Sequence, residues 1–221
     1  QKLQSYLVTL FEKGIILAIN SKNNPEDALQ VIESHPQMIL GNNHFAAWRI
    51  NWESKEKNML ELARELNLGL ESFVFVDDDP FQREFICMAF PEIAVLPPEF
   101  VDAYAGFHSF AITQEDRQRG AMYVQERMRK DLQKFLHTEE DFLKELNLRV
   151  TIREISDDAI ARASQLAQKT NQFNLTTRRY SQDDMRQYQK KGWLIWSIDV
   201  KDRFGDYGIV GIVMIEPQER V

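Results

Sequence analysis

The chain has 221 residues, of which 43% are hydrophobic and 11% aromatic; this is enough apolar side chain to bury a core and argues against a disordered chain. Lysine and arginine number 27 against 34 aspartates and glutamates, so the formal net charge is −7, which argues against a general nucleic-acid binder with a basic face. The single cysteine, Cys87, excludes an internal disulfide and fits a reducing compartment. No metal-ligand spacing accompanies it, so we expect Cys87 to be a small core residue. No apolar run approaches membrane-spanning length and no signal peptide is visible, so we expect a cytoplasmic protein without a membrane partner.

The first part of the chain alternates between helix and strand patterns. Apolar residues recur at helical spacing from Leu3 to Phe11, which predicts a helix that Gly14 ends. Further helices are predicted after an Asn24 cap, over 57–69 with Gly69 as the stop, and after an Asp79 cap. Alternation of this kind indicates the α/β class, with an open, mostly parallel sheet covered by helices on both faces. Short apolar runs predict the strands at 15–20, 37–40, 45–50, 72–76 and 92–97.

The second part of the chain has a different pattern. Residues 113–147 are highly charged and helical, which indicates a helical connector between two domains, 1–112 and 148–221. Beyond it, a strand pattern at 148–156 is followed by a helix pattern at 156–172. Two apolar runs then flank the polar turn KDRFGD and predict an antiparallel hairpin. We therefore expect the first half of an α+β domain here.

Polar residues gather where two of the predicted strands end. Asp77, Asp78 and Asp79 follow one strand, and Asn20 and Ser21 follow another. Open parallel sheets bind ligands at the carboxyl ends of their strands. Adjacent carboxylates repel one another, and a divalent cation removes that conflict; an oxygen-only cluster favours Mg²⁺. The alternative is that these carboxylates only cap a helix or face solvent; we favour the cap for Asp79 and metal binding for Asp77 with Asp78.

A hydroxyl and a lysine complete this set of residues. The Ser21 hydroxyl, together with the following backbone N–H of Lys22, can hold a phosphate oxygen. Lys55 can neutralise charge on a transferring phosphoryl group. Taken singly, Ser21 is more often a turn residue and Lys55 a solvated helix start, so only the ordered combination is informative. No G-x-x-x-x-G-K-[ST] motif is present, which excludes a Walker-type nucleotide site.

The runs IILAINSKNN, NWESKEKN and LNLGLESFVFVDDDPFQRE are similar to the second, third and fourth motifs of the haloacid-dehalogenase (HAD) superfamily, and the chain most resembles its FkbH-like subfamily of class IIIC. TQEDRQRGAMY, TNQFNLTTRRY and KDRFGDYGIVG resemble that subfamily's linker and acetyltransferase-like (GNAT-like) region. The resemblance implies a HAD-like, Rossmannoid domain followed by a partial GNAT-like domain. It also implies that Ser21 binds phosphate, that Lys55 is the motif-three lysine with Lys57 as an alternative, and that Asp78 ligates Mg²⁺ with support from Asp77.

The same resemblance implies an enzyme that takes a glyceryl unit from 1,3-bisphosphoglycerate, releases phosphate and loads the unit onto an acyl carrier protein. One alternative is a plain Mg²⁺-dependent phosphatase acting on a phosphorylated small molecule; another is a non-catalytic protein that binds the carrier. The basic loop of Arg178, Arg179 and Tyr180 is either solvated or a contact for the carrier. The family's D-x-D-x-T nucleophile motif is absent, and no glycine-rich coenzyme A turn follows Glu216. We therefore expect a piece of a longer protein that lacks the first strand of its HAD-like domain and is inactive alone.

Overall fold

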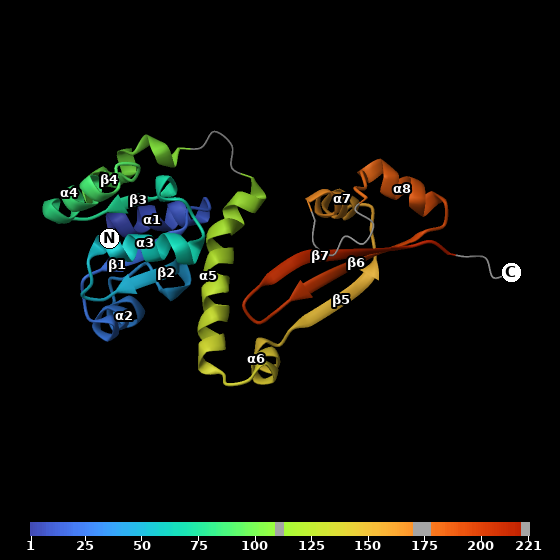
Figure 1. Ribbon diagram of the computed structural model, residues 1–221, viewed down its shortest axis with the longest axis horizontal. Coiled ribbons are helices and arrows are strands. Elements are labelled where there is room, and N and C mark those ends of the chain that lie inside the picture. Colours follow the sequence, from blue (N-terminus) through green and yellow to red (C-terminus); the bar gives the residue numbers. More distant parts are fainter. Residues whose placement is uncertain (109–112, 170–177, 218–221) are drawn as a thin grey trace. The chain divides into compact units, whose positions relative to one another are not determined.

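The computed structural model describes residues 1–108, 113–169 and 178–217. The chain forms two compact units, Gln1–Asp131 (unit 1) and Leu132–Val221 (unit 2). Helix α5 (Gln114–Phe135) begins in unit 1 and ends in unit 2 (Figure 1). Within the described ranges, no helix has both the length and the apolar character needed to cross a bilayer.

Unit 1 is a mixed α/β structure in which four strands form two parallel pairs, β1 with β2 and β3 with β4. The sequence predicted one open sheet, but across the described residues these pairs are separate two-stranded sheets. Side chains of helix α3 pack against both pairs, so the described residues connect the pairs through side-chain contacts. The strands are β1 (Leu17–Ser21), β2 (Phe45–Ile50), β3 (Val74–Val76) and β4 (Ala94–Leu96).

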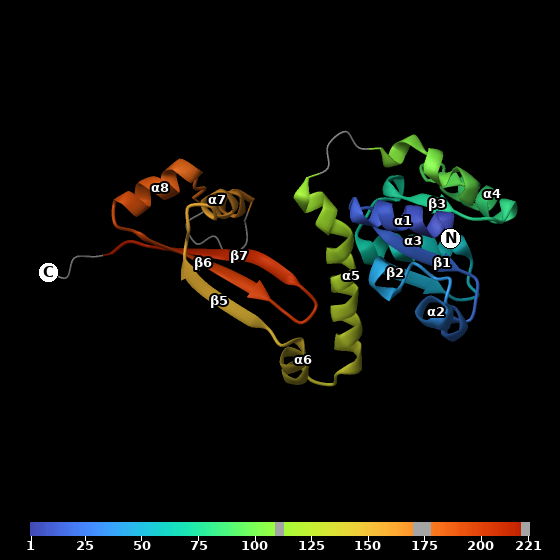
Figure 2. The same ribbon diagram turned by 180° about the vertical axis from the view of Figure 1, so that it is seen from behind.

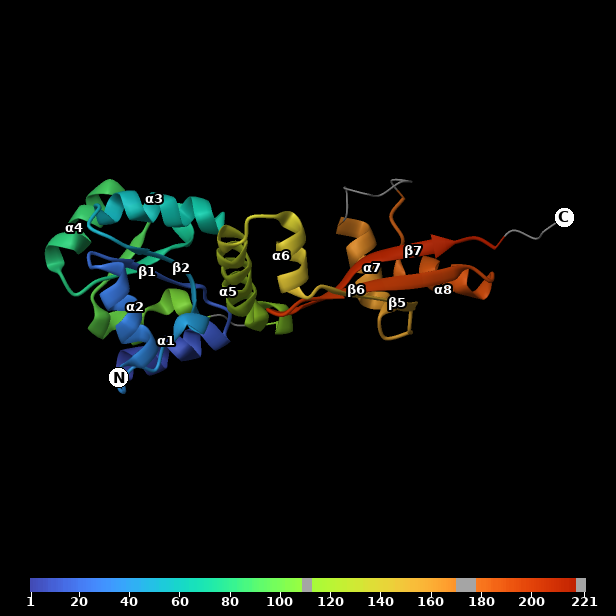
Figure 3. The same ribbon diagram turned by 90° about the horizontal axis from the view of Figure 1, so that it is seen from below.

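Helix α3 joins the two pairs through its buried face. Leu62 and Leu66 pack in one cluster with the two alanines of β2, whereas Met59 packs in another with Phe75 of β3 and Ile86 of α4. Figure 3 shows α3 on one face of the β1–β2 pair and α1 and α2 on the opposite face. The main helices of the unit are α1 (Lys2–Glu12), α2 (Pro25–Ser34), α3 (Lys55–Leu66) and α4 (Pro80–Ala89). Short 3-10 helices lie at Asn42–His44, Leu70–Ser72, Pro98–Ala103 and Ala105–Phe107.

Local capping signals explain where these helices begin. Asn24 precedes Pro25 at the start of α2, as predicted, although its side chain makes no capping hydrogen bond to the helix. Ser54 accepts a hydrogen bond from the Lys57 N–H and so starts α3 two residues before the predicted position. Asp79 caps α4 as predicted, with its carboxylate accepting the N–H of Phe81 at 2.9 Å.

Three local predictions are wrong. Helix α3 ends at Leu66, and its cap residue Asn67 adopts the left-handed conformation that Gly69 was expected to supply. Residues 37–40 form no strand, because their chain continues from a turn after α2 without a pairing partner. Cys87, which we would place in the core as a small apolar residue, is exposed, because Ile86 is the only residue that α4 buries.

Helix α5 packs along unit 1 (Figures 1 and 2). Its buried Arg127 donates hydrogen bonds to the carbonyl oxygens of Phe45 and Asn42, both at 3.0 Å. The guanidinium also lies 4.1 Å from the centroid of the Trp48 ring. These contacts tie the helix to the start of β2.

Unit 2 contains a three-stranded antiparallel sheet in the order β5–β6–β7. The predicted hairpin is confirmed, and its turn is fixed by Asp202, whose carboxylate accepts the N–H groups of Phe204 and Gly205 at 2.8 Å. Helices α7 and α8 cover one face of the sheet (Figures 1 and 3), with Met185 of α8 fully buried. The elements are α6 (Glu139–Leu146), β5 (Arg149–Glu154), α7 (Ile160–Lys169), α8 (Gln182–Lys190), β6 (Leu194–Lys201) and β7 (Asp206–Ile215).

Candidate functional site

The candidate site lies at the carboxyl ends of β1 and β3. Ser21 is the last residue of β1, and its carbonyl accepts the N–H of Asn51 at 3.1 Å, which extends the ladder to the end of β2. Asp77 follows β3 and donates its N–H to the carbonyl of Leu96 at 3.3 Å. Backbone hydrogen bonds therefore fix Ser21 and Asp77 at the carboxyl ends of their strands, where parallel sheets bind ligands.

Lys55 connects the two strand ends. It is the first residue of α3, and its ammonium forms an ion pair with the carboxylate of Asp77. Only 13% of the lysine side chain and 5% of the aspartate side chain are exposed. The second carboxylate oxygen of Asp77 accepts the N–H of Asp79 at 2.9 Å, so both oxygens are occupied and the lysine has a defined direction.

The alternative lysine, Lys57, does not share this position. Its ammonium lies 3.2 Å from the carboxylate of Glu53, and 55% of its side chain is exposed. The structure therefore brings Lys55, and not Lys57, to the acidic strand end.

The three consecutive aspartates have three different surroundings. Asp77 is buried against Lys55, Asp79 caps α4, and Asp78 is exposed. Arg83 of α4, which our sequence reading missed, donates from Nη1 to the carbonyls of Asp77 at 2.7 Å and Asp78 at 2.9 Å. Its sequence signal is an arginine in the first turn of a helix that follows an acidic loop. In the described part of the chain, no three His, Cys, Asp or Glu side chains converge as a metal cluster.

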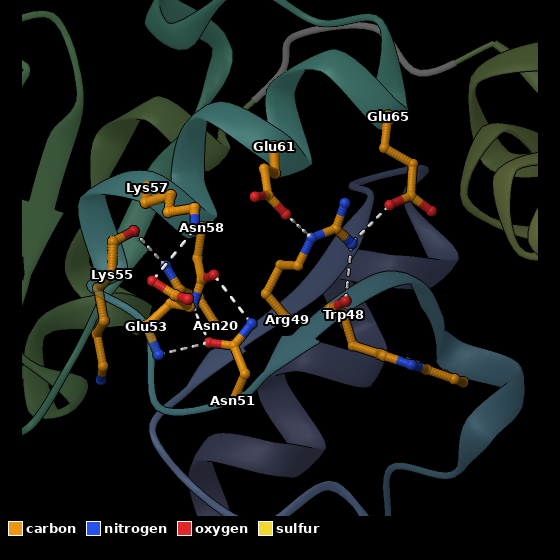
Figure 4. A network of polar contacts seen from close by, with 10 residues as sticks. All are labelled: Asn20, Trp48, Arg49, Asn51, Glu53, Lys55, Lys57, Asn58, Glu61 and Glu65. Carbon is orange, nitrogen blue, oxygen red and sulfur yellow. Dashed lines mark hydrogen bonds and ion pairs between the residues drawn. The ribbon is translucent and has the colours of Figure 1, made fainter.

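Three asparagine side chains form a hydrogen-bonded network beside Lys55 (Figure 4). Asn58 of α3 exchanges hydrogen bonds with Asn51 at 3.0 and 3.2 Å and donates to the Oδ1 of Asn20 at 3.1 Å. Asn20 in turn donates to the backbone carbonyl of Lys55 at 2.9 Å. The sequence did not lead us to predict this network. Its signal in the sequence is Asn58, an amide at a position of α3 where the apolar spacing predicts a buried hydrophobic side chain.

The predicted phosphate-binding residues lie next to this network. Ser21, directly after Asn20, is half-buried, and Lys22 is exposed in the loop that leads to α2. Ser21 therefore brings a hydroxyl to the end of β1, and Lys22 begins an exposed loop there. The side chain of Asn20 connects this strand end to the backbone of Lys55.

An ion-pair group on the outer side of α3 secures the helix to β2. Arg49 donates to Glu61 at 2.7 Å and to Glu65 at 2.6 Å (Figure 4). Burial alone would lower the pKa of Arg49, but the hydrogen bonds and charges of both glutamates outweigh it and raise that pKa. The hydrogen bond from Arg49 lowers the pKa of Glu61.

The predicted carrier-contact residues belong to unit 2. Arg178 and Arg179 are exposed. Tyr180 is half-buried against the helical core; its ring meets that of Tyr188 edge-on at 5.8 Å, and its carbonyl accepts the Ser164 hydroxyl at 2.9 Å. Tyr180 therefore has a packing role.

Comparison with known proteins gives one partial likeness. No family model matches the chain, and no curated protein matches it. A solved structure does match: the N-terminal part of the protein BF1531 from Bacteroides fragilis, which contains a phosphatase domain complexed with Mg. The match has 35% sequence identity and a TM-score of 0.43, and it covers 48% of this chain and 28% of that chain. With a TM-score below 0.5, the likeness assigns no function, so any assignment rests on the residues of the site.

Proposed function

We propose that unit 1 binds a phosphorylated small molecule at the carboxyl ends of β1 and β3 and releases phosphate in a Mg²⁺-dependent reaction of the HAD phosphatase type. The observation that carries the proposal is the buried ion pair of Lys55 with Asp77, beside the strand end that carries Ser21. An ammonium held in this way, at an edge where parallel sheets bind ligands, is suited to stabilise charge on a phosphoryl group.

Each residue of the site has a distinct role in this proposal. The Ser21 hydroxyl and the N–H of Lys22 bind a phosphate oxygen, because Ser21 ends β1 and Lys22 begins the loop that leaves it. Lys55 balances the negative charge of the leaving phosphate. Asp77 fixes the direction of the lysine side chain through their ion pair.

The donor set at the end of β3 fits Mg²⁺. Proteins commonly bind this ion through one or two carboxylates, leaving its other positions to water and substrate phosphate, so a cluster of three acidic side chains is not required. Asp78 has the exposed carboxylate that a direct ligand needs, and Asp77 adjoins it as the supporting carboxylate. When bound, the ion would shield the charge of the phosphate from an incoming nucleophile.

More specifically, we propose the FkbH-like reaction, in which the acyl–oxygen bond of 1,3-bisphosphoglycerate breaks, phosphate leaves, and the glyceryl unit ends as a thioester on the thiol of an acyl carrier protein; a simple phosphatase is the alternative. The donor is an acyl phosphate, whose leaving group is the phosphate that Lys55 and Mg²⁺ would stabilise. The exposed Arg178 and Arg179 of unit 2 support a carrier contact, since guanidinium groups suit a phosphopantetheine arm or an acidic carrier surface.

The first test is binding. Calorimetric titration of the protein with Mg²⁺ and inorganic phosphate together should show binding, and Asp78→Asn should weaken it about tenfold or more, as expected when a metal ligand loses its charge. Glu92→Gln, which removes an exposed carboxylate next to β4, is the matched control and should bind as the wild type does. A wild-type protein that binds neither ligand would refute the proposal.

The second test distinguishes the reactions. Because the D-x-D-x-T motif is absent from these 221 residues, the assay uses the full-length gene product. It is incubated with Mg²⁺, 1,3-bisphosphoglycerate and a holo acyl carrier protein, and the intact mass of the carrier is recorded. A gain of one glyceryl group supports the transferase. Phosphate release with an unchanged carrier identifies a phosphatase instead, whereas a complex with the carrier and no turnover would favour the non-catalytic binding module.

A further inference from the structure

Asn58 occupies a position on α3 where the helix otherwise buries apolar side chains. It is 1% exposed and lies on the same buried face as Leu62 and Leu66. Burying an amide costs free energy unless its hydrogen bonds are made. Here the oxygen of Asn58 accepts from Asn51, and its nitrogen donates to both Asn20 and Asn51.

The hydrogen bonds of Asn58 reach Lys55 by way of Asn20. The Nδ2 of Asn20 donates to the backbone carbonyl of Lys55 at 2.9 Å, while its Oδ1 accepts from Asn58 at 3.1 Å. Figure 4 shows the Lys55 carbonyl turned toward the asparagines and its side chain leading away from them. The amides therefore hold the backbone of this lysine and leave its ammonium for Asp77.

The same network fixes the strand end that carries the predicted phosphate-binding hydroxyl. Asn20 directly precedes Ser21, and the backbone N–H of Asn51 donates to the Ser21 carbonyl at 3.1 Å. Asn58 therefore links three points: the end of β1, the residue after β2 and the first turn of α3.

We infer that Asn58 is a positioning residue for the candidate site, which sets the place of Lys55 relative to Ser21 and aims its ammonium at Asp77. The position requires an amide, because it must donate two hydrogen bonds and accept one. An aspartate would lack the donors, and a leucine would leave the Oδ1 of Asn20 without its donor and the Nδ2 of Asn51 without its acceptor. The expected effect of Asn58 on phosphate binding rests on the proposed function, whereas its effect on the position of the Lys55 side chain does not.

The test compares Asn58→Leu with Leu62→Ala, which removes a buried side chain one turn further along the same helix face. Two properties are measured in addition to stability: the NMR signal of the Lys55 ammonium, which the ion pair with Asp77 slows in exchange, and the affinity for inorganic phosphate with Mg²⁺. We expect Asn58→Leu to broaden the Lys55 signal and to weaken phosphate binding about tenfold, the scale of losing an outer-shell partner. Leu62→Ala should lose stability and change neither property.

Asn20→Ala provides a second route if Asn58→Leu does not fold, since it removes the link to Lys55 and one acceptor of the Asn58 amide at a half-buried position. It should have the same effects, and in the double variant with Asn58→Leu the losses should not add, because both act through one chain of hydrogen bonds. The inference is overturned if either single variant folds and keeps both the Lys55 signal and the phosphate affinity. A wild-type protein that does not bind phosphate would refute the proposed function but not the inference about Asn58. The NMR signal of the Lys55 ammonium would then decide whether Asn58 is a positioning residue.

Discussion

Lys55 and Asp77 stand 22 residues apart in the chain and meet as an ion pair in the interior of unit 1. Withdrawing both charges from water costs free energy, which their attraction and the N–H of Asp79 on the second carboxylate oxygen offset. Such a pair contributes little net stability, but either charge left alone would be costly. The pair therefore determines which substitutions the site tolerates.

The first prediction concerns this pair. Asp77→Asn keeps an acceptor for the Asp79 N–H but leaves the Lys55 ammonium without a counter-charge, so it should destabilise unit 1 by about 3–5 kcal/mol. Adding Lys55→Met removes the orphaned charge and should restore a large part of that loss. Urea unfolding followed by the fluorescence of Trp48 and Trp52 measures both effects. Equal instability of the double and single variants would show that the two charges are not coupled.

The second prediction concerns Arg127 of α5. Its guanidinium donates to the carbonyls of Phe45 and Asn42, forms an ion pair with Asp131 and stacks on Trp48. Arg127→Lys keeps the charge but loses the planar fork, so the carbonyls of Phe45 and Asn42 lose the guanidinium donors and the free energy of unfolding of unit 1 should fall by about 1–3 kcal/mol.

Lys130→Ala is the matched control for Arg127→Lys, because this lysine lies on the same helix with 46% of its side chain exposed. Its removal should change the free energy of unfolding by less than about 0.5 kcal/mol. A loss as large as that of Arg127→Lys would mean that helix α5 as a whole, and not the guanidinium, responds to substitution.

The third prediction compares two glycines with positive φ. Gly14 (φ +93°) would place an added Cβ 1.8 Å from the carbonyl oxygen of Asp116, whereas Gly192 (φ +86°) has no atom within 4 Å of that point. Alanine at either position carries the left-handed backbone cost of about 1–2 kcal/mol. Gly14→Ala must in addition displace the start of α5, so hydrogen exchange of this helix should accelerate in Gly14→Ala and stay unchanged in Gly192→Ala. Unchanged exchange in both variants would contradict the predicted clash.

The sequence predicted the parts of the site that depend on local signals and on the geometry of parallel strands. Ser21 ends β1 and Asp77 follows β3, each at the carboxyl end of a parallel strand, where the sequence predicted ligand-binding residues, and the cap at Asp79 follows from the proline after it. Asn58 could not be recognised, because a single amide in a helix pattern does not reveal its partners from other elements. Helix α8 was missed because its segment is almost wholly polar, and the buried Met185 and the partly buried Tyr188 connect it to the core.

The last prediction concerns the capping box of α8. The hydroxyl of Ser181 donates to the carboxylate of Asp184, and this hydrogen bond, followed by that from the Ser181 backbone N–H, lowers the pKa of Asp184 below its ordinary value of 3.8. A carboxyl with a depressed pKa stabilises the fold above its ordinary pKa, and that contribution is lost as the pH falls through the folded-state value.

Ser181→Ala should therefore destabilise unit 2 most at neutral pH, and the difference from the wild type should shrink as the pH falls below 3.8. Part of the loss persists in acid, because the Ser181 oxygen also accepts the backbone N–H of Asp184 and that hydrogen bond does not titrate. In an Asp184→Asn background the effect of Ser181→Ala should be the same at every pH, since no carboxylate remains to titrate. Urea unfolding at a series of pH values measures both comparisons. If Ser181→Ala in the wild-type background lowers the free energy of unfolding equally at neutral and at acid pH, the hydroxyl does not act through the charge of Asp184.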